Sequence, residues 1–106
     1  MFISGKDIGS VQAEPGVRRK VLSYNQDMML CEIAFEKGAV GQIHAHPHTQ
    51  ISYVLRGRFV FTLGDETVVT EAGDAVLIES NTPHGVQAQE EGVLLDVFHP
   101  MRETFV

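Results

Sequence analysis

The chain has 106 residues, of which 43% are hydrophobic and 21% charged, and its formal net charge is −6. At this length we expect one domain over residues 1–106, built around a single hydrophobic core. The negative charge argues against a nucleic-acid partner, and the sequence shows neither a signal-peptide pattern nor an apolar run of roughly 20 residues, so we expect a cytoplasmic protein without membrane association.

Turn-forming residues punctuate the whole chain at intervals of roughly 8–12 residues, from Pro15-Gly16 to His99-Pro100. Residues 17–37 are long enough for a helix, but their apolar side chains recur at every second position, as in a strand: Met29, Cys31, Ile33 and Phe35. Residues 59–63 and 76–78 repeat this alternation. We therefore predict an all-β chain of about 9–11 strands, folded as a short barrel or a two-sheet sandwich.

The first strands, within residues 1–23, carry few core-forming side chains of their own. We expect them to pair with a second copy of the chain, because such pairing would also cover an exposed sheet edge. The sequence therefore predicts a homodimer with these strands at its interface.

Cys31 is the only cysteine, so no disulfide within the chain supports the fold. It lies in the apolar segment 28–33, where a buried small side chain is the expected role and a nucleophile the alternative.

Three of the five histidines lie within residues 44–48. On an extended strand, His44 and His46 point to the same face, about 6–7 Å apart along the chain, so both imidazoles can reach one metal ion. Gln50 has the same parity and offers an amide oxygen. A further ligand must come from elsewhere, and His84, after the turn Asn81-Thr82-Pro83, is the candidate.

Two histidines are expected to lie outside this ligand set. His48 shares the parity of His46, but Pro47 interrupts the strand before it, so we expect a supporting or surface position. His99 lies beside Pro100 near the end of the chain, where we expect solvent contact.

The pattern Gly38-x5-His44-x-His46-x3-Gln50-x6-Gly57 resembles the first motif of the cupin family of small β-barrels, with Gln50 at the usual glutamate position. Gly73 and His84 match part of the second motif, in which Glu79, Asn81 and Ala88 replace the usual proline, glycine and asparagine. The resemblance implies a cupin-type β-barrel, the jelly-roll-like double-stranded β-helix, with one divalent metal ion on His44, His46, Gln50 and His84. The ion would be nickel, zinc, iron, manganese or cobalt.

The neutral ligand Gln50 removes no charge from such an ion. Three imidazoles and one amide leave the full divalent charge facing the pocket, which suits the stabilisation of an enolate or alkoxide. The same donor set is less suited to holding a highly charged ferric state, which disfavours redox dioxygenase chemistry.

The segment Val93–Phe98 is apolar at nearly every position except Asp96, so we expect both faces of this strand to be covered. Burial of an acid there is costly unless the acid is paired or used. Asp96 and Phe98 share parity, and Arg102 follows with a guanidinium suited to a carboxylate. The alternative is that Asp96 and Arg102 pair with each other or with groups at the surface.

The chain is also similar to the small pectin-degradation cupins, through residues 35–39, His44-Ala45-His46-Pro47-His48, residues 83–86, residues 91–98 and Arg102. This resemblance implies conversion of 4,5-unsaturated monouronates, derived from galacturonate or alginate, to linear keto acids. Asp96 would transfer the proton, Phe98 would pack on the sugar and Arg102 would bind the carboxylate of this small anionic substrate. A lyase or dioxygenase of another small acid, or a non-catalytic binding module, is the alternative.

Overall fold

The computed structural model describes all residues, Met1–Val106, as ten strands and two short 3-10 helices, η1 (Gly5–Asp7) and η2 (Glu103–Phe105). One sheet has the order β1 (Val11–Glu14), β2 (Val17–Tyr24), β3 (Met29–Phe35), β10 (Gly92–His99), β5 (Thr49–Arg56), β8 (Ala75–Ile78). The other has the order β4 (Val40–His44), β9 (His84–Ala88), β6 (Arg58–Leu63), β7 (Glu66–Glu71). No helix is long and apolar enough to cross a bilayer.

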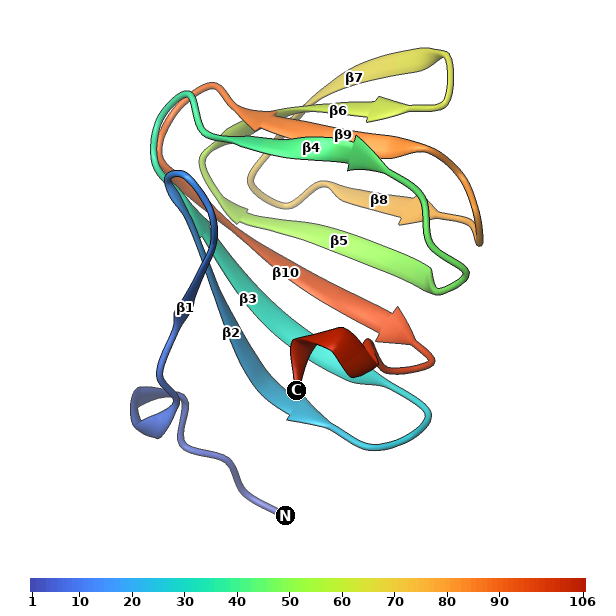
Figure 1. The fold of residues 1–106 in the computed structure, drawn as a ribbon. Helices are drawn as coiled ribbons and strands as arrows, with labels where there is room; N and C mark the ends of the chain where they lie inside the picture. Colours follow the sequence, from blue (N-terminus) through green and yellow to red (C-terminus); the bar gives the residue numbers. More distant parts are fainter.

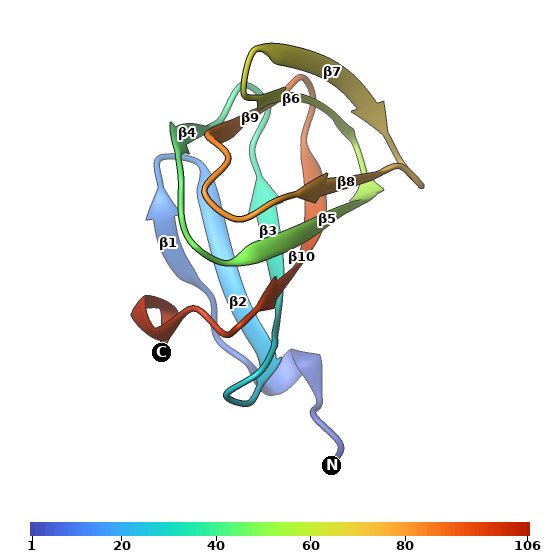
Figure 2. The same ribbon diagram turned by 90° about the vertical axis from the view of Figure 1, so that its right-hand side faces the viewer.

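The two antiparallel sheets face each other as a jelly-roll sandwich (Figures 1 and 2), which confirms the predicted all-β class. A cluster of 13 buried hydrophobic residues fills the space between them. Strand β3 alternates as predicted, with every second side chain buried from Met29 to Phe35. The Phe35 ring meets the edge of the Phe59 ring from the opposite sheet, at 5.2 Å between centroids.

Strand β10 lies in the middle of the six-stranded sheet, between β3 and β5. Leu94, Asp96 and Phe98 face the interior and are buried. Leu95 and Val97 lie on the outer face and are only half-buried. The apolar sequence led us to expect that both faces of this strand are covered, but the outer face is covered less than the inner one. Asp96 is therefore an acid on the inner side of a central strand.

The N-terminal strands belong to the sheet of their own chain. Strand β1 pairs with β2, and β2 pairs with β3 along its length. Val17 of β2 is buried in the core, so these strands contribute more to the fold than their sequence indicates. The homodimer stays a prediction.

Cys31 is fully buried in β3, as expected of a small apolar residue. Burial, together with the nearby Asp96 carboxylate, raises the pKa of its thiol to about 12. The nucleophile alternative is therefore disfavoured by chemistry as well as by access.

The turn between β8 and β9 brings the second histidine segment to the first. Asn81 adopts a left-handed conformation, with φ of 63°, which asparagine tolerates better than most residues. Its backbone N–H donates to the carbonyl of His46 at 2.7 Å. The connection after β4 and the approach to β9 are thereby held together at one end of the sandwich.

Candidate metal centre and active site

Three histidines converge at the open end of the sandwich. His44 ends β4, His46 lies in the connection to β5, and His84 begins β9 opposite His44. One ring nitrogen from each lies within 4.8 Å of the other two. The strand expected to continue through His46 ends at His44, yet the two rings still meet, with centroids 5.3 Å apart.

Backbone carbonyls fix the orientation of two of these rings. Because a carbonyl oxygen can only accept, Nδ1 of His84 donates to Thr82 at 2.8 Å and Nδ1 of His46 donates to His48 at 3.1 Å. In each neutral ring, Nε2 therefore carries a free lone pair, and Nε2 of His84 is buried without any hydrogen-bond partner. His48 therefore supports the cluster through its backbone carbonyl.

Gln50 completes the cluster from β5. Its amide nitrogen donates to the Ser52 hydroxyl at 2.9 Å, which turns its Oε1 toward Nε2 of His46 at 3.0 Å. Two acceptors thus face each other in a buried position, an arrangement that costs free energy unless both bind the same cation.

The donor set fits a divalent transition metal ion. Loss of water around the His44 ring, with His84 and His46 nearby, lowers its pKa to about 4, although its side chain remains exposed at the mouth. Burial lowers the pKa of His84 as well. The rings of His44 and His84 therefore stay neutral at physiological pH and keep their lone pairs available. Together with His46 they form a cluster that can bind a metal ion.

Asp96 lies at the bottom of the cavity and is 8% exposed. It accepts a 2.6 Å hydrogen bond from the Ser52 hydroxyl. Burial raises the pKa of its carboxyl to about 6, and the hydrogen bonds from Ser52 and Gln50 limit that rise. The two ion pairs in the structure lie elsewhere, so the pairing of Asp96 with Arg102 considered above does not form.

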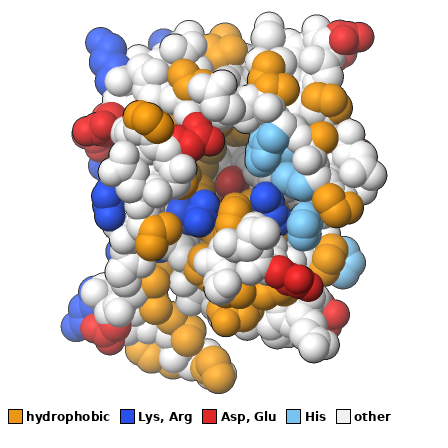
Figure 3. Space-filling view, viewed as in Figure 1, with side chains coloured by type: hydrophobic (Ala, Val, Ile, Leu, Met, Phe, Trp, Pro, Cys, Tyr) orange, Lys and Arg blue, Asp and Glu red, His pale blue; other side chains and the backbone are white.

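A cavity of about 120 Å³ joins these groups between the sheets. The surface is hollowed here, with histidines on one side and basic side chains at the rim (Figure 3). Six predicted site residues line the cavity: His44, Gln50, His84, Asp96, Phe98 and Arg102. His46 is buried beside it, with its ring 6.0 Å from that of Phe98.

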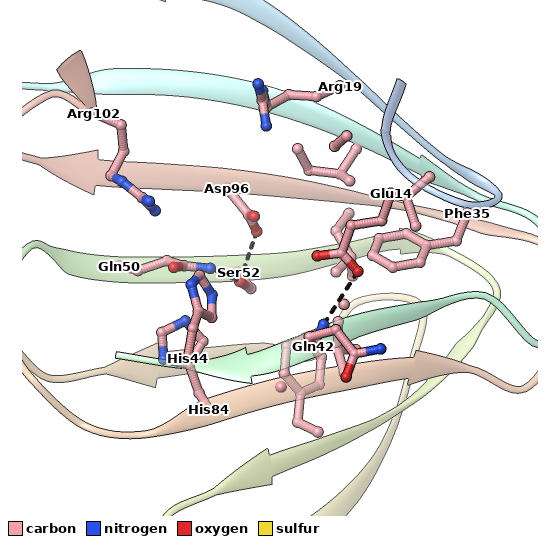
Figure 4. A pocket seen from close by; sticks show the side chains of 18 of the residues that line it. Glu14, Arg19, Phe35, Gln42, His44, Gln50, Ser52, His84, Asp96 and Arg102 are labelled. Atoms are coloured by element: carbon pink, nitrogen blue, oxygen red, sulfur yellow. Dashed lines mark hydrogen bonds between the residues drawn. The ribbon is translucent and has the colours of Figure 1, made fainter. Parts of the chain in front are cut away.

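Glu14, Arg19, Ser52 and Phe105 are among the lining residues that the sequence analysis missed. Ser52 carries a detectable signal, because it shares the parity of Gln50 on β5. Arg19 shares the parity of the buried Val17 on β2, and its side chain extends toward the cavity (Figure 4). Phe105 follows the last strand in η2, and no periodic pattern places it.

The chain is similar to known proteins in sequence and in fold. The family model described as Cupin domain matches residues 31–98. Pectin degradation protein KdgF of Dickeya dadantii (strain 3937) is 40% identical over 93 residues, covering 86% of this chain and 84% of that protein. The solved structure of KdgF from Halomonas sp. superposes with a TM-score of 0.95 at 33% identity, over 100% of this chain and 98% of that one. The solved structure of an RmlC-like cupin from Shewanella frigidimarina NCIMB 400 superposes with a TM-score of 0.96 at 36% identity, over 99% of this chain and 95% of that one.

Proposed function

The chain belongs to the cupin family, and from this premise we propose that it is a metal-dependent isomerase that converts 4,5-unsaturated monouronates to linear keto sugar acids. The observation that carries the proposal is a buried carboxyl, Asp96, in the same cavity as the three-histidine cluster. The 40% identity to a protein named for pectin degradation supports the substrate class.

A divalent ion on His44, His46, His84 and Gln50, whether nickel, zinc, iron, manganese or cobalt, would supply Lewis acidity to a developing oxyanion. All four ligands are neutral, and they would therefore leave the full charge of the ion to act on the substrate. Ser52 holds the Gln50 amide so that its oxygen, and not its nitrogen, faces the histidines.

The reaction balances without an oxidant or reductant. The hydroxyl on C1 loses its proton and the bond from C1 to the ring oxygen breaks, which gives an aldehyde at C1 and an enolate at C5. Protonation of C4 then turns the enolate into a ketone. Asp96 accepts and returns the proton, and Ser52 fixes the carboxyl through one of its two oxygens.

Phe98 and Arg102, which follow Asp96 in the chain, hold the substrate. The Phe98 ring forms an apolar wall against which a sugar face packs. The Arg102 guanidinium is half-buried, makes no ion pair with a protein acid and lies 5.3 Å from the centroid of that ring. A free planar cation in this position suits the substrate carboxylate.

The test is loss of the ultraviolet absorbance of a 4,5-unsaturated uronate on addition of the metal-loaded protein. We expect depletion well above the rate without protein, and none above it with chelator-treated protein. Binding of the sugar without depletion would instead identify a binding module, and oxygen dependence or a cleaved product would identify a dioxygenase or lyase.

We also propose that the protein works as a homodimer in the cytoplasm. Light scattering coupled to size-exclusion chromatography measures the mass of the particle, and a mass near 11.7 kDa would contradict the dimer.

A further inference from the structure

Arg19 is a basic residue on the inner side of β2. Val17, Arg19 and Val21 alternate along this strand, and Val17 belongs to the core. The Nε atom of Arg19 is buried without a hydrogen-bond partner, and no acid lies within ion-pair distance of its guanidinium. A partly buried cation left unpaired by the protein costs free energy, and such a cost points to a ligand.

The Phe105 ring lies against two guanidinium groups. The Arg19 guanidinium carbon is 3.7 Å from the centroid of this ring, and that of Arg102 is 4.5 Å from it. Two positive charges therefore lie against the same aromatic ring at the cavity rim. A ligand rich in oxygen atoms relieves their repulsion and satisfies their free N–H groups.

The two arginines face different parts of the cavity. Arg102 and Gln50 lie toward one end, Glu14 and Gln42 lie toward the other, and Arg19 lies between them (Figure 4). One carboxylate oxygen of Glu14 accepts from the Gln42 backbone N–H at 3.3 Å. This region thus offers hydrogen-bond donors from Arg19 and acceptors from Glu14. A hydroxyl group can accept from Arg19 and donate to Glu14.

We propose that Arg19 and Glu14 form a subsite for the hydroxyl-bearing end of a six-carbon sugar acid, whose carboxylate is bound by Arg102. This proposal rests on the proposed function and extends it. Arg19 is a specificity-determining residue: it distinguishes polyhydroxy acids from short acids that carry the same carboxylate but no hydroxylated chain.

The experiment measures binding, without turnover, by calorimetry on the metal-loaded protein. The probes are D-galacturonate, a saturated six-carbon acid, and pyruvate, which ends at the third carbon. The variant is Arg19→Gln, and the matched control is Arg18→Gln, its exposed neighbour on β2 whose guanidinium contacts Ser10. Arg102→Ala serves as the reference for loss of carboxylate binding.

We expect Arg19→Gln to weaken galacturonate binding about tenfold or more, because hydrogen bonds to a charged donor are lost, and to change pyruvate binding less than twofold. Arg18→Gln should change neither affinity, and Arg102→Ala should weaken both. Equal weakening of both probes by Arg19→Gln, or of neither, would overturn the subsite. Thermal unfolding reports whether the Arg19→Gln variant folds. If it does not fold, Arg19→Lys takes its place, because lysine keeps the charge but lacks the planar guanidinium. We expect the same selective loss of galacturonate binding for Arg19→Lys.

The subsite and the proposed reaction fail in different ways. Selective loss of galacturonate binding, with no turnover of an unsaturated uronate by the native protein, would leave the subsite standing and refute the isomerase. Turnover without galacturonate binding, or with unchanged selectivity in Arg19→Gln, would refute the subsite and leave the isomerase standing.

Discussion

The Ser52 hydroxyl donates a 2.6 Å hydrogen bond to the carboxylate of Asp96 while it accepts one of 2.9 Å from the amide of Gln50. All three side chains are buried. The proposed acid–base residue and a proposed metal ligand are thus oriented by the same hydroxyl. A change at Asp96 can therefore affect metal binding, and a change at Gln50 can affect proton transfer.

We expect Ser52→Ala to weaken metal binding about 10–100-fold, because the Gln50 amide loses the partner that orients it. Stability should fall by about 1–3 kcal/mol, since two buried polar groups lose a hydrogen bond. Metal titration of the stripped protein measures the first effect. Thr70→Val is the control, because it removes another buried hydroxyl, bonded to the Phe59 carbonyl, away from the cavity. Metal affinity within twofold of the native protein would contradict the orienting role of Ser52.

His46→Ala should lose the metal ion and the activity together and keep the fold. The site lies at one end of the sandwich, and the core between the sheets consists of hydrophobic residues that this change leaves in place. Elemental analysis and circular dichroism measure both properties. His99→Ala, at an exposed histidine bonded to the Asp27 carbonyl, should retain the metal. Full metal occupancy in His46→Ala would show that the ligand set is different.

Gln50→Glu should keep or tighten metal binding but lower the turnover number. A carboxylate cancels part of the charge of the ion and so weakens its stabilisation of an enolate oxygen. Steady-state kinetics at saturating metal measure this effect. A turnover number equal to that of the native protein would refute our explanation for the neutral ligand.

Much of the site was predictable because strand parity fixes which side chains share a face. Alternation grouped Asp96 with Phe98, and both line the cavity. His44, His46 and Gln50 also lie close together, but not through the parity of one strand, because β4 ends at His44 and β5 begins only at Thr49. Spacing along one strand says nothing about which groups of another strand lie opposite. The contact of Ser52 with Asp96 depends on the pairing of β5 with β10, so the sequence did not reveal it.

The C-terminal part of the cavity illustrates the same limit. Arg19 and Phe105 are 86 positions apart in a chain whose local patterns predict strands only, and their contact depends on how η2 folds back over β2. In the structure, Arg18 is exposed while Arg19 faces the cavity, as the twofold period of a strand requires.

The metal-free protein should respond to pH through Asp96. Burial raises the pKa of its carboxyl from 3.8 to about 6, so the folded state keeps a proton that the unfolded chain releases between these values. The free energy of unfolding therefore falls as pH rises from 3.8 to about 6, by at most about 3 kcal/mol, because Asp96 becomes ionised in the folded protein. Above pH 6 the full loss of stability persists. Asp96→Asn keeps an acceptor for Ser52 and removes the charge.

We expect the metal-free Asp96→Asn variant to be more stable than the native protein by about 1–3 kcal/mol at pH 8 and close to it at pH 4. Urea unfolding at both pH values gives the two differences in free energy. A difference that does not grow between pH 4 and pH 8 would contradict the buried, uncompensated carboxylate.

The central claim is that Asp96 delivers a proton to C4 of an unsaturated uronate inside the cavity, and the configuration of the product tests it most directly. The reaction is run in D2O, and the early product is analysed by nuclear magnetic resonance. We predict one deuterium at C4 in a single configuration with the native protein, and a rate lower by about 10²–10⁴-fold with Asp96→Asn. An equal mixture of both C4 configurations with the native protein, as expected for protonation by solvent, would contradict the claim.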